Sequence, residues 1–576
     1  MQIALDTLPQ DARYDVVVIG AGGAGMAAAL FAALEGMRVL LVERTAHVGG
    51  TSALSAATLW VPNTHHAAAI GAQDSLEQAE QFLRNVVGNR SSEAVRRSFL
   101  VNAPRAIARL EAESDVKFRA YPAHPDYVQE AEGATLRGRA LEPLPFDGRR
   151  LGAAFALVRP PIPEFTVLGG MMVDRNDIGH LLQMTTCWDS FRYAAGLLGR
   201  YAADRMRYSR GTRLVMGNAL IGRLLLSLLD RGIDIVTETD VAELQRGPRG
   251  VEAVVLRQNV AARRVGVRRG VIMATGGFNR HPQRRVAMLP AEVPVHCPGA
   301  PGHTGAVHDL ALALGARYGE GALDHVFWAP VSVRRRRDGS TAVFPHFVLD
   351  RGKPGTVVVN QSGRRFVNEA TSYHLFTRAM LQAHQTTPSI PAFLIADANA
   401  LRKYGLGMVR PGGRGLGPFI ADGYLIEAPT LAALAAVLDI DAAALTETVA
   451  AMNAYAETGV DPEFGRGSTA YHRHNGDPQQ TPNPNLGPIR QAPFYAVRLY
   501  PGDIGAATGL VTDPDAQVLD GDNRPIGGLY AIGNDMHSIM GGTYPGPGIT
   551  LGPGLTFAYV AVRHAAGGHG SSSVSQ

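Results

Sequence analysis

The stretch that decides the fold runs from Tyr14 to Glu43 and reads YDVVVIGAGGAGMAAALFAALEGMRVLLVE. It predicts an apolar strand, a glycine-rich turn, an alanine-rich helix and a second apolar strand. The turn, Gly20–Gly25, has the GxGxxG spacing, in which glycines allow a pyrophosphate to approach the helix N-terminus closely. Glu43 ends the second strand, where a carboxylate can accept hydrogen bonds from ribose hydroxyls. We therefore predict a dinucleotide site in a Rossmann-like α/β domain.

Composition excludes several other classes of protein. The 576 residues include two cysteines, which is too few for a disulfide framework or a cysteine-rich metal site. We expect no metal, and we expect Cys187 in the core. The formal net charge is +4, and the one basic run, Arg334–Arg337, is expected at a hairpin tip. No basic stripe with interleaved aromatic residues is present, so no nucleic-acid partner is expected.

A hydropathy plot alone would mislead at Val16–Leu34, which has no charged residue and approaches the ~20 residues of a membrane span. Its four glycines disfavour a membrane helix. The N-terminus lacks a basic region followed by a cleavage site, so we expect no signal peptide. A cytoplasmic location is expected.

The segment after Glu43 indicates FAD rather than NAD as the dinucleotide. HVGGTSALS, from His47, resembles the loop of flavoproteins that contacts the second phosphate and the isoalloxazine. VIMATGGF (Val271–Phe278) and GLYAIGNDM (Gly528–Met536) are further strands that run into glycine-rich turns. We expect non-covalent FAD, because the only histidine of this loop precedes the GG pair. The residues expected to hold FAD are Gly20, Gly22, Gly23, Ala24, Gly25, Glu43, Arg44, Gly49, Gly50, Thr51, Ser52, Ser55, Ala56, Val241, Ala274, Thr275, Gly276, Gly277, Gly533, Asn534, Thr550 and Leu551.

These motifs, with GRRFVNE at Gly363–Glu369, resemble the fumarate reductase/3-ketosteroid dehydrogenase superfamily of flavoproteins over residues 14–565. The fumarate reductase branch binds a dicarboxylate with arginines and histidines, one of them in NExxTR. Here the run is NEATSY, so Tyr373 takes the place of that arginine. The two other anion-binding regions are replaced by GDIGAATG and SIMGGTYPGPGITLGP. Fumarate reduction is therefore not expected.

The residues in those places resemble the 3-ketosteroid Δ1-dehydrogenases, which carry tyrosines in NExxxY, in TYPGxG and near PDY. This chain has Tyr373 in NEATSY, Tyr544 and Gly548 in TYPGPG, and Tyr127 in HPDY, with Tyr121 as a competitor for the last role. The resemblance implies that the Tyr544 hydroxyl and the Gly548 N–H bind the substrate carbonyl. Such donors stabilise the charge that an enolate develops. It implies also that Tyr373 is the base and that Tyr127 assists it.

The resemblance implies an FAD domain built from separate chain segments and a second α+β catalytic domain. Residues 128–212 look expanded relative to compact members and combine an apolar stretch, Leu151–Val173, with a later arginine-rich amphipathic pattern. We expect this insert to be either a lid over the site or a membrane-contacting surface. The expected segments are 1–127 (first FAD-binding segment), 128–212 (insert), 213–300 (second FAD-binding segment), 301–484 (catalytic domain), 485–566 (third FAD-binding segment) and 567–576 (flexible tail).

The expected function is FAD-dependent introduction of a C1–C2 double bond into a 3-ketosteroid, with an external electron acceptor. Three alternatives stay open: the same desaturation of a smaller cyclic ketone, a flavin-dependent reductase of an activated alkene, and a flavin-binding protein without catalysis. Asp535 and His537, beside the last glycine-rich turn, are expected to be structural. The hydrophobic ketone is the expected partner, with peripheral membrane contact through the insert possible, and the sequence leaves the oligomeric state open.

Overall fold

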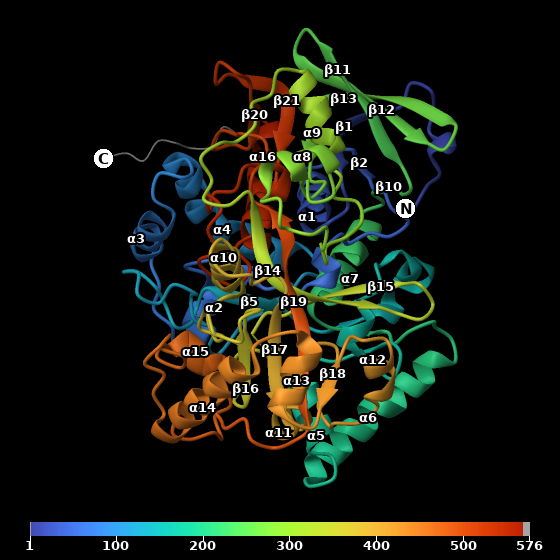
Figure 1. Ribbon diagram of the computed structural model, residues 1–576. Coiled ribbons are helices and arrows are strands. Elements are labelled where there is room, and N and C mark those ends of the chain that lie inside the picture. The colour runs from blue at the N-terminus through green and yellow to red at the C-terminus, as the bar shows by residue number, and fades with distance from the viewer. Residues whose placement is uncertain (1, 349, 568–576) are drawn as a thin grey trace.

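A computed structural model describes residues 2–348 and 350–567. Two large sheets dominate the chain, the first built from its beginning, middle and end and the second mainly from residues 326–506. Figure 1 shows the first sheet in the upper half of the molecule and the second in the lower half, with the red C-terminal strand and helix returning beside the blue N-terminal elements. The expected tail falls, apart from Gly567, outside the described residues.

The first sheet has the strand order β10-β2-β1-β13-β12-β11, and β21 lies on β13 with β20 at its side. The pairs that join β10, β2, β1, β13 and β21 are parallel, so their carboxyl ends share one edge of the sheet. The glycine-rich turns after β1, β13 and β21 therefore meet. The strands are β1 (Arg13–Ile19), β2 (Val39–Val42), β10 (Asp234–Val236), β11 (Asp240–Gly247), β12 (Gly250–Gln258), β13 (Ala261–Met273), β20 (Gln517–Leu519) and β21 (Pro525–Ala531).

Apolar helices cover this sheet. α1 (Gly23–Leu34) buries nearly every residue because it is enclosed by the sheet and by α16 (Leu551–Ala565) and α7 (Met216–Leu229). The rings of Phe31 and Tyr559 meet edge to face with centroids 5.3 Å apart. α4 (Glu93–Glu113) also packs against α16. The resulting rigid layer fixes the start of α1, where the first glycine-rich turn lies.

The second sheet has the order β15-β14-β19-β17-β16, with β18 also on β19, and its pairs are antiparallel. β19 (Phe494–Ala506) spans its centre, although a division at residue 484 would assign this strand to the FAD domain. Alternating burial alone does not tell a strand which of two sheets it joins. The other strands are β14 (Val326–Arg335), β15 (Thr341–Pro345), β16 (Thr356–Val359), β17 (Ala392–Asp397) and β18 (Ile426–Ala428).

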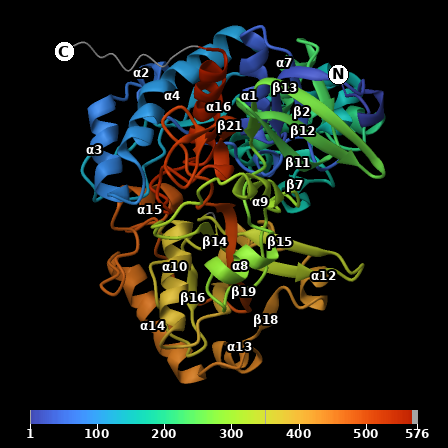
Figure 2. The same cartoon turned by 90° about the horizontal axis from the view of Figure 1, so that it is seen from above.

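Helices and short elements complete the two halves, and Figure 2 shows them around the sheets from above. α10 (Tyr373–His384) packs against β14, and α13 (Leu431–Leu438) packs against α14 (Ala442–Thr458). The remaining elements are α2 (His65–Ala69), α3 (Leu76–Val87), α8 (Pro282–Met288), α9 (Ala306–Ala313), α11 (Ala398–Tyr404), α12 (Gly417–Ala421), α15 (Ala470–Asn475) and the strands β3 (Leu59–Trp60), β4 (Phe118–Ala120), β5 (Ala140–Pro143), β6 (Phe146–Asp147) and β9 (Arg213–Leu214).

Residues 128–212 contain the helices α5 (Arg175–Leu182) and α6 (Trp188–Arg205) and the small strands β7 (Thr166–Val167) and β8 (Met171–Met172), besides β5 and β6. Figure 1 shows α5 and α6 in teal at the lower right. The insert reaches the second sheet, where the rings of Phe165 and Phe344 lie 5.1 Å apart. The prediction that Cys187 is a core residue is wrong: it precedes α6 on the exposed side of the insert. Among the described residues, no helix is both long and apolar enough to cross a membrane.

Candidate active site

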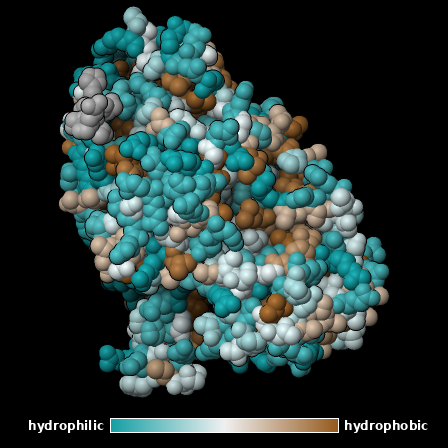
Figure 3. Space-filling model, turned by 90° about the vertical axis from the view of Figure 1, so that its left-hand side faces the viewer, coloured by the Kyte–Doolittle hydropathy of each residue, from teal (hydrophilic) through white to brown (hydrophobic). Residues whose placement is uncertain are grey.

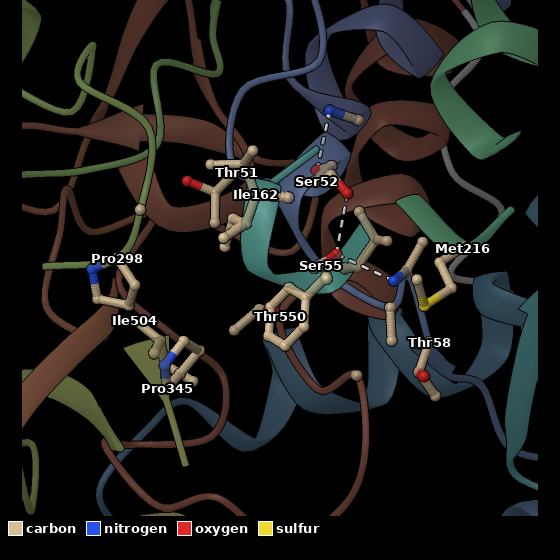
Figure 4. A pocket seen from close by; sticks show the side chains of 18 of the residues that line it. Thr51, Ser52, Ser55, Thr58, Ile162, Met216, Pro298, Pro345, Ile504 and Thr550 are labelled. Atoms are coloured by element: carbon tan, nitrogen blue, oxygen red, sulfur yellow. Dashed lines mark hydrogen bonds between the residues drawn. The ribbon is translucent and has the colours of Figure 1, made fainter. Parts of the chain in front are cut away.

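A cavity of about 1710 Å³ lies where the first sheet, the second sheet and the insert meet. Pockets for one drug-sized ligand have volumes of roughly 300–1,000 Å³, so this cavity has space for two molecules. Figure 4 shows three of its walls: Thr51, Ser52 and Ser55 from the loop after β2, Pro345 and Ile504 from the second sheet, and Ile162 from the insert. The site is thus shared by elements far apart in sequence.

Most of the residues predicted to hold FAD line one end of this cavity. Three of the predicted glycines do not line it, and each packs against protein instead. A Cβ at Gly25 would lie 1.8 Å from the Gly20 carbonyl oxygen, one at Gly49 2.8 Å from the Ala53 side chain, and one at Gly277 2.5 Å from that of Ala506. The residues that do line it are Gly20, Gly22, Gly23, Ala24, Glu43, Arg44, Gly50, Thr51, Ser52, Ser55, Ala56, Val241, Ala274, Thr275, Gly276, Gly533, Asn534, Thr550 and Leu551.

The first glycine-rich turn presents backbone to this end of the cavity. A Cβ at Gly22 would meet no atom within 4 Å, so the chain there borders open space. α1 begins at Gly23, and the first amides of a helix have no intrahelical acceptor, which suits them to bind phosphate oxygens. The Glu43 carboxylate accepts from the Ala21 amide at 2.9 Å and from the Thr45 amide at 2.8 Å. A third bond, from the Thr45 hydroxyl, leaves about one of its four acceptor positions for a ribose.

The turns after β13 and β21 are held together by one buried carboxylate, that of Asp535. It accepts from the Gly277 amide at 2.9 Å and from the Thr275 hydroxyl at 2.8 Å, and it pairs with His308 at 2.9 Å. Burial raises the pKa of Asp535, but the hydrogen bonds from His308 and Thr275 outweigh burial and hold that pKa below its usual value. Asp535 therefore acts as the structural support that the sequence predicts. His537 lies partly buried beside Gly319 and does not line the cavity.

Two residues at the cofactor end were missed from the sequence. Arg159, in the insert, donates to the Thr45 hydroxyl at 2.6 Å. The Nε2 atom of His303 lies 3.1 Å from the Thr51 hydroxyl, while its Nδ1 is buried without a partner among the described residues. No motif marks either residue, because each reaches the cavity only through tertiary packing. The glycine turns, the free helix start, the acceptor on Glu43 and the orphaned nitrogen together fit FAD.

Three tyrosines from distant segments converge beside these residues. The Tyr127 hydroxyl donates to the Tyr373 hydroxyl at 3.4 Å. The ring of Tyr544 lies 5.0 Å from that of Tyr373 and 5.9 Å from that of Tyr127, measured between centroids. All three line the cavity. The competing Tyr121 instead approaches the Thr58 hydroxyl, at 3.4 Å, and makes no contact with Tyr373 among the described residues.

Burial controls the protonation of this cluster. It raises the pKa of Tyr544 to about 12 and that of Tyr373 well above its ordinary value. Tyr544 therefore stays protonated and can donate a hydrogen bond. Tyr373 also holds its proton near neutral pH, so it must lose that proton before it can accept one from another molecule. The raised pKa thus favours Tyr544 as a hydrogen-bond donor and opposes the loss of a proton by Tyr373.

Gly548 must be glycine for a structural reason. Its φ is +84°, and a Cβ would lie 2.1 Å from the carbonyl oxygen of Thr58. The neighbouring backbone therefore excludes a side chain here, whether or not a ligand is bound. The Gly548 carbonyl accepts from the Trp60 amide at 3.1 Å, while its own N–H has no acceptor among the described residues. That N–H borders the cavity and is available to a ligand.

Further aromatic residues enclose the tyrosines, and sequence reasoning missed them. The ring of Tyr471 lies 4.8 Å from that of Tyr127, and its buried hydroxyl has no partner in the described part of the chain. Phe347 packs 4.9 Å from Tyr373, and Phe327 lies 5.2 Å from Tyr544. They come from α15 and from around β14, so only the three-dimensional fold brings them here.

α10 begins at Tyr373, and a buried ion network fixes that helix start. Arg365 bonds Glu369 at 2.9 Å and Asp461 at 2.8 Å, with all three side chains almost fully buried. Arg351 donates to the carbonyls of Glu369 and Thr371. The GRRFVNE motif therefore positions Tyr373, and none of its residues lines the cavity. The motif in the sequence thus indicates a structural network.

The comparisons with known proteins agree with this geometry. The FAD binding domain family model matches residues 15–551. A 4-oxocyclohex-2-ene-1-carboxylate 5-dehydrogenase of Sinomonas cyclohexanicum is 38% identical, over 96% of this chain and 93% of that protein. A 3-oxosteroid 1-dehydrogenase of Mycobacterium tuberculosis is 34% identical, over 96% and 98%.

Solved structures give the same result. The crystal structure of 3-ketosteroid delta1-dehydrogenase from Sterolibacterium denitrificans, in complex with 1,4-androstadiene-3,17-dione, is similar with a TM-score of 0.89. It is 33% identical and covers 97% of this chain and 100% of that one. A flavocytochrome c3 fumarate reductase shares the fold, at 20% identity and a TM-score of 0.64 over 98% of this chain and 80% of that one.

Proposed function

The chain belongs to the FAD-binding flavoprotein family that includes 3-oxosteroid 1-dehydrogenases, and from that premise we propose that it desaturates a ketone between its α and β carbons. It is an FAD-dependent oxidoreductase. The proposed substrate is a 3-ketosteroid, which would gain a C1–C2 double bond. The observation that carries the proposal is the cluster of Tyr373, Tyr544 and Tyr127. The cluster lines the same cavity as Gly548, whose N–H has no acceptor in the described part of the chain.

In the proposed mechanism, Tyr544 and Gly548 bind the substrate carbonyl. Both donors are held in place before the substrate arrives, so they can stabilise an enolate without reorganising. The protonated Tyr544 hydroxyl and the unpaired Gly548 N–H both face the cavity. Their combined effect is to acidify the α-proton.

Tyr373 then removes the α-proton. Tyr373 acts in its phenolate form and becomes the neutral phenol when it takes this proton. The Tyr127 hydroxyl, which donates to the Tyr373 hydroxyl, assists it and passes the proton outward. FAD, when bound, supplies the two-electron acceptor that takes the hydride from the β carbon. An external electron acceptor would be needed to take up these two electrons and complete the cycle. Aromatic and aliphatic walls exclude water from the reacting atoms.

A smaller cyclic ketone is the second candidate substrate. The relative with 38% identity is named for a carboxylated cyclohexenone, and a further relative, 33% identical, for 4-oxocyclohexanecarboxylate. The tyrosines act only on the ring that carries the ketone, so the same site serves either substrate. A reductase of a dicarboxylate stays disfavoured, since a tyrosine replaces the arginine of that branch.

The insert is proposed both to close the cavity and to touch a membrane. Ile178, Leu181 and Leu182 line the cavity from α5, which supports the lid. Leu182, Trp188 and Met206 are strongly exposed on the insert, which supports an interface with lipid. We propose a peripheral contact of a cytoplasmic protein. We also retain the six-segment division of the chain as a proposal, with β19 assigned to the second sheet.

Product analysis tests this function. The purified holoenzyme, incubated with androst-4-ene-3,17-dione and an artificial electron acceptor, is expected to form a product two mass units lighter. Deuterium at C1 and C2 should slow the reaction. A product hydroxylated or reduced at another position would contradict the proposal, as would absence of product with both the steroid and cyclohexanone.

A further inference from the structure

Arg175 is a cation of the cavity wall that has no partner among the described residues. It lies at the start of α5, borders the cavity and makes no hydrogen bond or ion pair there. The carboxylates on the same wall of the cavity are already paired: Glu142 with Arg119 at 2.7 Å, and Asp174 with Arg213 at 3.5 Å. Neither of these carboxylates is therefore left to balance the positive charge of Arg175.

Two imidazoles on the same wall carry buried nitrogens without partners in the described chain. These atoms are Nδ1 of His124 and Nε2 of His474, and the two rings lie 5.7 Å apart. A buried polar atom without a partner costs free energy, so in a native site it calls for a ligand or water. Both residues line the cavity.

The charge around these imidazoles favours an anion. Burial lowers the pKa of His124 to about 3, with His474 and Arg175 lowering it further. Burial likewise lowers the pKa of His474 to about 4, helped by Arg175 and Lys353. Neutral imidazoles donate through one nitrogen each, and the nearby guanidinium remains unpaired. An anionic group would gain both charge and hydrogen bonds here.

We infer that Arg175, together with His474 and His124, forms a subsite for a carboxylate carried by the ketone substrate at its end away from the reacting carbonyl. The inference rests on the proposed function, which supplies the position of the carbonyl at Tyr544 and Gly548. It deepens that function by naming the substrate class: a keto acid, either a cyclohexanone carboxylate or a steroid with an acidic side chain. The steroid core alone would leave the subsite unfilled.

The subsite is close to the reaction centre and separate from the cofactor end. From Tyr544 the rings lead to Tyr127 at 5.9 Å and from Tyr127 to His124 at 6.4 Å. The phosphates of FAD belong at Gly20–Gly25, where the start of α1 receives them. Arg175 is therefore not required for the cofactor.

Steady-state kinetics test the inference directly. With 4-oxocyclohexanecarboxylate and its methyl ester as substrates, the wild-type enzyme should prefer the acid through a lower KM. Arg175→Gln should raise KM for the acid by about 10- to 100-fold and leave the ester within about twofold, because a hydrogen bond to a charge is lost only for the acid. Arg175→Lys should recover some of the preference. Arg192→Gln, which removes an exposed charge of α6 outside the cavity, is the matched control.

Binding without turnover provides a second readout. 4-Hydroxybenzoate presents a phenol to the carbonyl site and a carboxylate to the subsite, whereas its methyl ester lacks the charge. Calorimetry on the holoenzyme should give a lower Kd for the acid, and Arg175→Gln should remove that difference. Equal Kd values for acid and ester in the wild-type protein would overturn the inference.

The results also separate the inference from the proposed function. Turnover of both ketones without preference for the acid would overturn the subsite and leave the desaturation intact. Turnover of neither ketone nor androst-4-ene-3,17-dione would overturn the proposed function. A parallel assay with 3-oxochol-4-en-24-oate distinguishes the two kinds of keto acid. Arg175→Gln should raise KM for only one of the two acids, and that acid represents the substrate class.

Discussion

Burial raises the pKa of both Tyr544 and Tyr373, with opposite consequences for their tasks. A proton donor to an enolate works best when it stays protonated, so burial helps Tyr544. A base must lose its proton, so burial opposes Tyr373. In the proposed mechanism this opposition is offset by the acidity that Tyr544 and Gly548 give the substrate.

The rate of proton abstraction should therefore rise with pH. The active form of Tyr373 is the phenolate, and a raised pKa confines that form to alkaline solution. We expect kcat/KM to increase through the alkaline range, and Tyr373→Phe to lower it by roughly 100- to 10,000-fold. Stopped-flow measurements across pH check this, with FAD absorbance reporting that the variant still binds cofactor. A rate that falls above neutral pH would exclude Tyr373 as the base.

The start of α10 depends on charges that no ligand touches. Arg365, Glu369 and Asp461 are buried together below the helix that begins at Tyr373. Burial lowers the pKa of Arg365, but Glu369 and Asp461 outweigh this and raise it above its usual value. The network thus stabilises the charged state of all three residues and sets the position of Tyr373.

Breaking this network should destabilise the protein. Arg365→Met leaves two carboxylates buried with too few partners, which costs about 3–5 kcal/mol. Arg364→Gln removes the neighbouring exposed pair with Glu447 and should cost only about 0–1 kcal/mol. Urea unfolding followed by circular dichroism compares the two variants. Equal destabilisation by both substitutions would contradict a supporting role for the network.

The elements most predictable from sequence are those whose signals are local. The GxGxxG turn, Glu43 and the tyrosine motifs depend on spacing within a few residues, and the structure brings them into one cavity. Tyr471, His303 and Arg175 have no such signal, since they reach the cavity through contacts between distant segments. The prediction for Cys187 was wrong for a related reason: the residue type alone does not show whether the side chain lies on the buried or the exposed face of the insert.

At the scale of the whole molecule, exposed apolar residues are unevenly distributed. One face shows hydrophobic side chains only in small separate groups on a hydrophilic background (Figure 3). The insert instead exposes Trp188 at 72% and Met206 at 80%, and the rings of Trp188 and Phe191 stack 5.4 Å apart. Amphipathic aromatic side chains of this kind suit a membrane interface.

Removing these rings should weaken vesicle binding and spare catalysis. Trp188→Ser with Phe191→Ser is expected to lower the fraction of protein that sediments with anionic vesicles by roughly tenfold, because apolar burial in lipid is lost. Turnover of a water-soluble ketone should stay unchanged. Vesicle binding that is absent in the wild-type protein, or unaltered in the double variant, would contradict a membrane role for the insert.

The most direct measurement of the central claim is anaerobic mixing of the holoenzyme with androst-4-ene-3,17-dione while the flavin absorbance is followed. We expect the steroid to bleach the flavin absorbance rapidly. In Tyr544→Phe the bleaching should be slower by about 100- to 1,000-fold, because one hydrogen-bond donor to the enolate is lost. Bleaching by cyclohexanone alone would keep the mechanism and change the substrate class. No bleaching by either ketone, or an unchanged rate in Tyr544→Phe, would contradict the account.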